Sequence, residues 1–194
     1  MKSRIAINGT ALDVGAGNCY CDGKNWSPGL SFEGKIVRAD IIQKPGIDVE
    51  MDADKNWPLK NASFDVVYAA HVIEHVKNPF HFVKEAHRVL KPKGILYIRR
   101  PHLSNPVLYG IVDHLRGGTT TTFNTFDADV QEALFEKDVQ FKTIEIDYGI
   151  RLGKVMRPII DLIGFVNYEY FLANKFIPID EIRYVMQKIT VENK

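Results

Sequence analysis

Carboxylates and glycines follow short apolar runs in the first third of the chain. The run TALDVGAGN contains Gly15 and Gly17, spaced by one residue. Glycines at this spacing permit a tight turn that brings the backbone close to a ligand, as a cofactor-binding loop requires. The runs KIVRAD and IDVEMDA end in Asp40 and in Asp52 followed by Ala53. Asp40 lies 23 positions after Gly17, near the place where a nucleoside-binding acid is expected, so the pattern predicts a cofactor site.

Histidines form a second group that could do chemistry. His71, Glu74 and His75 spell H-x-x-E-H, which also matches a zinc peptidase signature. That signature requires a helix that holds both histidines on one face, together with a third ligand. Here the motif directly follows the apolar run FDVVYAA, so we predict no metal site and place His71 at the carboxyl edge of a sheet. His71, His75, His102 and Tyr109 are candidate bases by position, but the sequence singles out no catalytic residue.

Strands of a parallel sheet are needed to bring these side chains to one edge. The continuous apolar run at 64–70 is typical of a parallel strand that is covered on both faces. Residues 18–34 show no sustained helical period and are predicted to be mostly loop. The predicted strands are 10–14, 35–40, 47–51, 64–70, 95–98, 141–150 and 182–189.

Two helices are predicted between these strands. Asn78 and Pro79 form an N-cap and first-turn pair, and the apolar stripe that follows has helical spacing until KPKG stops the helix. The second helix is predicted from Asp127 or Ala128 to Lys137, again from apolar residues at helical spacing.

The composition is that of an ordinary globular chain. Its 194 residues are 45% hydrophobic and 25% charged, with a formal net charge of +1, and predict a single domain over residues 1–194. Because this charge provides no basic field, a nucleic-acid partner is disfavoured. The chain has no apolar signal core and no run of roughly 18 apolar residues, so we expect a soluble, cytoplasmic protein without a membrane span. Cys19 and Cys21 are interpreted as reduced, unpaired thiols.

Five blocks of the chain, in order, resemble the class I S-adenosylmethionine-dependent methyltransferases, and especially the small-molecule branch with a methyltransferase type 11 domain. LDVGAGN is similar to the first motif of this family, ADII to its second-strand acid, and MDADKNWPL to its acid-alanine element. FDVVYAAHVIEHV and EAHRVLKPKGILYI are similar to its fourth-strand and fifth-strand blocks. The resemblance runs from Ala11 to about His102. It implies a Rossmann-like α/β fold, a three-layer sandwich around a mostly parallel seven-stranded sheet with an antiparallel last strand.

The resemblance also implies S-adenosylmethionine as the cofactor, with a role for each matching residue. Gly15 and Gly17 would leave room for its methionine part. Asp40 would accept hydrogen bonds from both ribose hydroxyls, and Asp52 one from the adenine amino group. The other residues implied in cofactor binding are Ala53 through its backbone, Asp13 near the ammonium group, and His71.

Some residues depart from the family pattern. Cys19 stands where a third glycine often occurs, Lys93 replaces a common glycine, and the helix after the first strand is poorly encoded. The N-terminal helices that usually roof the cofactor are expected to be absent. We therefore interpret residues 151–178, and chiefly the apolar and aromatic part 155–178, as an insertion that covers the acceptor pocket. The alternative is that this segment is core or a homodimer face.

The residues leave two functions open. The favoured one is an S-adenosylmethionine-dependent methyltransferase that acts on a small molecule. The other is a methyltransferase fold that binds a partner without methyl transfer, because the first crossover is poorly encoded. Release of S-adenosylhomocysteine would distinguish the two functions.

Overall fold

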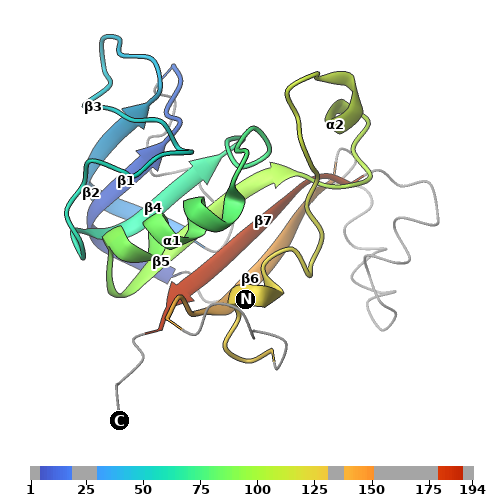
Figure 1. Ribbon diagram of the computed structural model, residues 1–194. Coiled ribbons are helices and arrows are strands. Elements are labelled where there is room, and N and C mark those ends of the chain that lie inside the picture. Colours follow the sequence, from blue (N-terminus) through green and yellow to red (C-terminus); the bar gives the residue numbers. More distant parts are fainter. Residues whose placement is uncertain (1–4, 19–29, 131–137, 151–178, 190–194) are drawn as a thin grey trace.

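The computed structural model describes residues 5–18, 30–130, 138–150 and 179–189, and Figure 1 shows how they are arranged. Their strands are β1 Ile5–Val14, β2 Leu30–Asp40, β3 Val49–Glu50, β4 Phe64–Ala70, β5 Leu90–Pro101, β6 Phe141–Ile150 and β7 Ile179–Lys188. They form a seven-stranded sheet in the order β3-β2-β1-β4-β5-β7-β6. β1 to β5 pair in parallel, and β7 runs antiparallel to both β5 and β6. The predicted mostly parallel sheet with an antiparallel last strand is confirmed.

The strand bounds differ from the predicted ones in several places. β1, β2, β5 and β7 begin earlier than predicted, and β3 is reduced to two residues. The helix ends before KPKG as predicted, but KPKG already lies inside β5 and is not a separate turn. The backbone is already extended at Leu90, which pairs with Phe64 of β4. The pairing of β4 with β5 then shifts register between Phe64 and Val66, and within β5 Lys93 adopts a left-handed φ of 64°.

The segment around Asp127 does not begin a helix, and this part of the prediction is wrong. A short 3-10 helix, η1 Asn124–Phe126, precedes it, and Asp127 forms a β-bridge with Phe141. The Asp127 side chain accepts hydrogen bonds from Asp129 N at 3.0 Å and Thr143 N at 3.3 Å. The β-bridge and the bond to Thr143 N tie Asp127 to β6, so the backbone at this residue is not helical. The rest of the predicted helix, residues 131–137, lies outside the described residues.

The helix predicted after Asn78 is present as α1 Pro79–Val89. Asn78 Oδ1 accepts from His81 N at 3.1 Å, and proline occupies the first turn, where its missing N–H costs no hydrogen bond. The short helix α2 Val107–Gly110 follows β5. None of the helices in the described part of the chain is long and apolar enough to cross a membrane.

Replacing the cap as Asn78→Ala is expected to lower the free energy of unfolding by about 1 kcal/mol, because His81 N loses its acceptor. Asn78→Asp keeps an acceptor at the same position and is the matched control. Urea unfolding followed by circular dichroism measures both variants. An unchanged midpoint in Asn78→Ala would show that the cap does not stabilise α1.

Both faces of the sheet carry buried side chains. On one face lies α1, as Figure 1 shows. It packs through residues such as Phe82 and Val83, which are fully buried. On the other face Tyr68 and Tyr97 stack with their ring centroids 5.1 Å apart. Among the described residues, α1 supplies the helical layer of the first face, and the three-layer arrangement stays a prediction.

Candidate functional site

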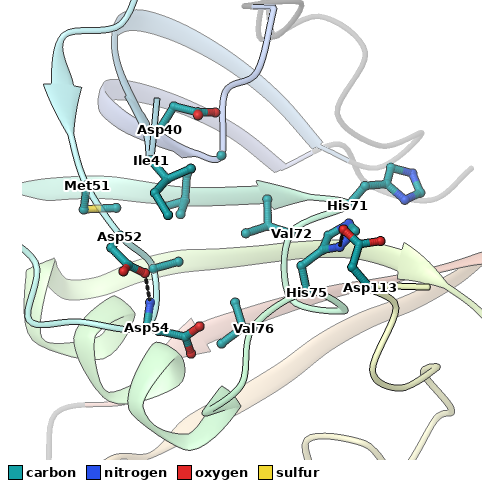
Figure 2. Close-up of a pocket in the computed structure, with 13 residues that line it drawn as sticks. Asp40, Ile41, Met51, Asp52, Asp54, His71, Val72, His75, Val76 and Asp113 are labelled. Carbon is teal, nitrogen blue, oxygen red and sulfur yellow. Dashed lines mark hydrogen bonds and ion pairs between the residues drawn. The ribbon is translucent and has the colours of Figure 1, made fainter. Parts of the chain in front are cut away.

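A pocket of about 340 Å³ lies at the carboxyl ends of β1, β2, β3 and β4 (Figure 2). In the sheet, β1 has β2 on one side and β4 on the other, so the strand order reverses at this point. Crevices outside such a switch point are where open α/β sheets bind ligands. The four loops after the strands, together with Asp113 from a distant segment, line the pocket.

The glycine turn after β1 is fastened to the end of β2. Gly15 and Gly17 both adopt left-handed φ values, 66° and 54°. A Cβ added to Gly15 would approach Val72 Cγ2 to 2.4 Å, so a side chain has no room there. Gly17 N donates to Asp40 Oδ2 at 2.8 Å, and Asp40 Oδ1 accepts from Ile42 N at 3.0 Å. The carboxylate of Asp40 therefore fixes the turn while it lines the pocket.

The acidic segment after β3 also lines the pocket, as Figure 2 shows for Asp52 and Asp54. Asp52 Oδ1 accepts from Asp54 N at 2.9 Å, and Lys55 Nζ lies 3.1 Å from Asp52 Oδ2. These two contacts lower the pKa of Asp52 and keep it ionised. Asp54 in turn accepts from the backbone N–H groups of Lys77 and Asn78, at 3.2 and 2.9 Å, and ties the segment to the start of α1.

His71 leaves β4 with a left-handed φ of 57° and joins a network of charges. Its Nε2 lies 3.6 Å from Glu181 Oε2, and its Nδ1 lies 3.2 Å from Glu74 Oε1. Both carboxylates favour the imidazolium, the Glu181 contact more, and raise the pKa of His71 to about 9. Burial alone would raise the pKa of Glu181, but its contacts with His71, Arg183 and Arg99 lower it to about 2. His71 is therefore charged at neutral pH.

The H-x-x-E-H motif does not lie on a helix. Residues 71–78 form turns between β4 and α1. His71 contacts Glu74, whereas His75 Nδ1 lies 3.1 Å from Asp113 Oδ2. The two histidines thus have different partners, and the helix that the peptidase signature requires is missing from this part of the chain.

The protonation of His71 predicts a pH dependence of stability. Because the folded-state pKa of about 9 exceeds the ordinary value of 6.5, His71 stabilises the fold fully below pH 6.5 and loses this contribution as pH rises through 9. The free energy of unfolding is expected to fall more between pH 6 and pH 9.5 in the unmodified protein than in His71→Gln. His81→Gln, on α1, is the control. Identical pH profiles for the unmodified protein and His71→Gln would contradict the raised pKa.

Five of the seven residues predicted to contact a cofactor lie together in the pocket. Asp13 and Gly17 do not line it. Asp13 is buried in β1 with 3% of its surface exposed. Gly17 donates its N–H to Asp40, which does line the pocket. The role of each residue toward a cofactor stays a prediction. The five that line the pocket are Gly15, Asp40, Asp52, Ala53 and His71.

Sequence reasoning did not assign several other residues to the pocket. Ile41, Val72 and Val76 provide apolar surface, and each lies next to a predicted site residue or inside a recognised block. His75 appeared as a candidate base. Asp113 gave no sequence signal, because it lies far along the chain and enters only through the fold.

Sequence comparisons point to one family. A family model described as a methyltransferase domain matches residues 29–98, which include Asp40, Asp52 and His71. A Mycolicibacterium smegmatis protein named Probable S-adenosylmethionine-dependent methyltransferase is 34% identical over 74 residues, 38% of this chain and 29% of that protein. Demethylmenaquinone methyltransferase of Chlamydia muridarum is 43% identical over 55 residues, 27% of this chain and 24% of that enzyme. The chain thus spans less than a third of these curated relatives.

Solved methyltransferase structures share the fold of this chain. A SAM dependent methyltransferase from Archaeoglobus fulgidus superposes with a TM-score of 0.58 at 16% identity, over 93% of this chain and 86% of that one. At this identity the likeness shows the fold alone. In sequence, the chain is thus similar to S-adenosylmethionine-dependent methyltransferases over part of its length, with the methyltransferase-domain match at residues 29–98, and it shares their fold.

Proposed function

We propose that the pocket binds S-adenosylmethionine and that the protein transfers its methyl group to a small molecule. The observation that carries this proposal is the pair of carboxylates, Asp40 and Asp52, that line a pocket at the switch point of the sheet. Carboxylates after the second and third strands of such a sheet suit the hydroxyl and amino donors of a nucleoside.

Asp40 and Asp52 are proposed to hold the nucleoside. Each oxygen of Asp40 accepts one backbone N–H, and a carboxylate oxygen has a second lone pair, so both remain able to accept from a ribose hydroxyl. Asp52 would accept from the adenine amino group, with the Ala53 backbone at the ring edge. The apolar side chains of Ile41 and Val72 suit the faces of a purine ring.

The other proposed contacts concern the methionine end of the cofactor. Gly15 lets Val72 pack closely against the turn, and the turn that contains Gly17 would carry backbone N–H groups past the amino-acid part. His71 lies at the rim of the pocket (Figure 2). Asp13 is proposed to act on the ammonium group through water, since it does not line the pocket itself.

Methyl transfer from a sulfonium is an in-line displacement. The bond from carbon to the acceptor atom forms while the bond from carbon to sulfur breaks, and sulfur keeps the electron pair as a neutral thioether. Catalysis of this step depends mainly on placing the two reactants on one axis. His71 is already protonated at neutral pH, with its pKa at about 9, so it is unsuited to act as a general base. We therefore propose that His71 is not a catalytic base.

The acceptor is proposed to be a small molecule because the matching blocks resemble the small-molecule branch of the family, and because a net charge of +1 provides no basic field for a nucleic acid. The proposed domain bounds, 1–194, and the proposed cover, residues 151–178, belong to this hypothesis. The cover lies outside the described residues.

The test supplies the protein with S-adenosylmethionine labelled in its methyl group, together with a cell extract. Label in a low-molecular-weight product and release of S-adenosylhomocysteine are the expected results. Label in protein or nucleic acid would contradict the small-molecule part. Cofactor binding without release of S-adenosylhomocysteine would contradict methyl transfer and favour a binding protein.

A further inference from the structure

Three side chains that can ligate a metal converge beside the pocket. One ligand atom from each of Glu74, His75 and His114 lies within 4.8 Å of those from the other two. Glu74 and His75 lie in the turns after β4, and His114 lies in the segment after α2. A backbone bond from Leu115 N to Glu74 O, 2.8 Å long, holds the two segments together. The cluster is thus fixed by the fold and does not depend on one flexible side chain.

Two polar atoms of this cluster are buried without a hydrogen-bond partner among the described residues. Glu74 has none of its surface exposed, and its Oε1 contacts His71 while its Oε2 has no partner. The Nδ1 atom of His114 is likewise buried without a hydrogen-bond partner. An unsatisfied buried polar atom costs roughly 1 to 3 kcal/mol, so each such atom calls for an explanation. A cation between them would satisfy both.

Asp113 orients the imidazole of His75, a member of the cluster. Its Oδ2 lies 3.1 Å from His75 Nδ1, as the dashed line in Figure 2 marks. When Nδ1 donates its proton to Asp113, Nε2 carries the lone pair that a metal needs. A carboxylate that accepts from the far nitrogen of a ligating imidazole is the usual support of such a ligand.

We propose that Glu74, His75 and His114 bind a first-row divalent transition metal ion such as Zn²⁺. Two imidazoles and one carboxylate suit Zn²⁺ or Co²⁺ better than Mg²⁺, which prefers oxygen ligands alone. Metal–ligand bonds of about 2.0 to 2.2 Å place tetrahedral ligand atoms roughly 3.4 Å apart, so the cluster closes on the ion through small side-chain movements. This replaces the expectation of no metal. It differs from the peptidase signature because His114, and not His71, completes the set.

The position of the cluster suggests what the ion would bind. His75 and Asp113 line the pocket, and three protein ligands leave coordination positions open. An ion there would bind an oxygen atom of the methyl acceptor and promote its deprotonation. This second step rests on the proposed function, whereas the metal site itself does not.

The experiment measures Co²⁺ and Zn²⁺ binding to the untagged full chain without S-adenosylmethionine. Bound metal is determined after equilibrium dialysis, and the visible absorption of bound Co²⁺ reports its ligands. One equivalent is expected in the unmodified protein. His114→Ala is expected to lower the affinity at least about tenfold and Asp113→Asn about ten- to a hundredfold. His114 is chosen over Glu74, whose carboxylate also acts on the buried Arg100.

Matched controls decide the outcome. His81→Ala removes a histidine of α1 outside the cluster and is expected to bind metal like the unmodified protein. Equal binding by the unmodified protein and His114→Ala, or an equal loss in His81→Ala, would overturn the proposed site. Urea unfolding shows that each variant is folded. A separate titration with S-adenosylmethionine distinguishes the metal site from the proposed function. Metal binding without cofactor binding would contradict only the proposed function.

Discussion

Glu85→Ala is expected to lower the free energy of unfolding by about 2 to 4 kcal/mol. Glu85, 8% exposed on α1, accepts from the backbone N of Trp57 at 2.7 Å and from Arg88 Nε at 2.8 Å. Arg88 continues the link by donating to the carbonyl oxygens of Leu59 and Trp57. Removing the carboxylate leaves the buried Trp57 N–H without an acceptor and the guanidinium without its counter-charge.

Urea unfolding of Glu85→Ala and Glu85→Gln measures this effect. The Gln variant keeps an acceptor for Trp57 N but removes the charge, so it is expected to lose less stability than the Ala variant. Glu33→Ala, an exposed residue of β2, is the control and should change the free energy of unfolding by no more than about 0.5 kcal/mol. A loss in Glu85→Ala as small as in Glu33→Ala would contradict the buried role of Glu85.

The contacts of Glu85 and Arg88 with the segment around Trp57 also support the pocket. Trp57 lies shortly after Asp52–Asp54, and its Nε1 donates to Ala53 O at 3.5 Å. Releasing this segment from α1 loosens the acidic side of the pocket, although Glu85 does not line it. Glu85→Ala is thus also expected to weaken cofactor binding, as a consequence of lost order and not of a lost contact.

The elements that were predicted well carry their signal locally. The β4 strand and the N-terminus of α1 follow from an uninterrupted apolar run and from the pair Asn78 and Pro79, whose physics involves only neighbours in sequence. The reach of β1 and β2 toward their N-termini was missed because their polar residues, such as Asn8 and Glu33, pair across the sheet and do not form an apolar run. Pairing between strands is not visible in one segment.

The part of the site that lies next to the strands was predicted, whereas the residues that long-range contacts bring to it were not. Asp40 ends β2 and Asp52 closely follows β3, so parallel pairing alone brings them to one edge. Asp113 and His114 reach the pocket region through the segment after α2, which meets Glu74 by a backbone bond. The charge of His71 likewise depends on Glu181 in β7, over a hundred positions away. Long-range contacts of this kind leave no local pattern.

Asp40→Ala is expected to reduce affinity for S-adenosylmethionine roughly ten- to a hundredfold, or about 1.5 to 3 kcal/mol. Two effects add in this variant. The ribose hydroxyls lose their proposed acceptors, and Gly17 N loses the oxygen that holds the glycine turn. Isothermal titration calorimetry measures the affinity, and unfolding in urea shows whether the fold is intact.

Two further variants separate these effects. Gly17→Ala strains a backbone with φ of 54°, yet its Cβ would meet no atom closer than Gly15 O at 3.8 Å, so it disturbs the turn while the carboxylate stays. If Asp40 acts directly on the cofactor, Asp40→Ala loses clearly more affinity than Gly17→Ala. Asp48→Ala removes a carboxylate between β2 and β3 that accepts from Arg38 N but does not line the pocket, and it should bind normally. Unchanged affinity in Asp40→Ala would remove Asp40 from the site, whereas equal losses in Asp40→Ala and Gly17→Ala would reduce its role to holding the turn.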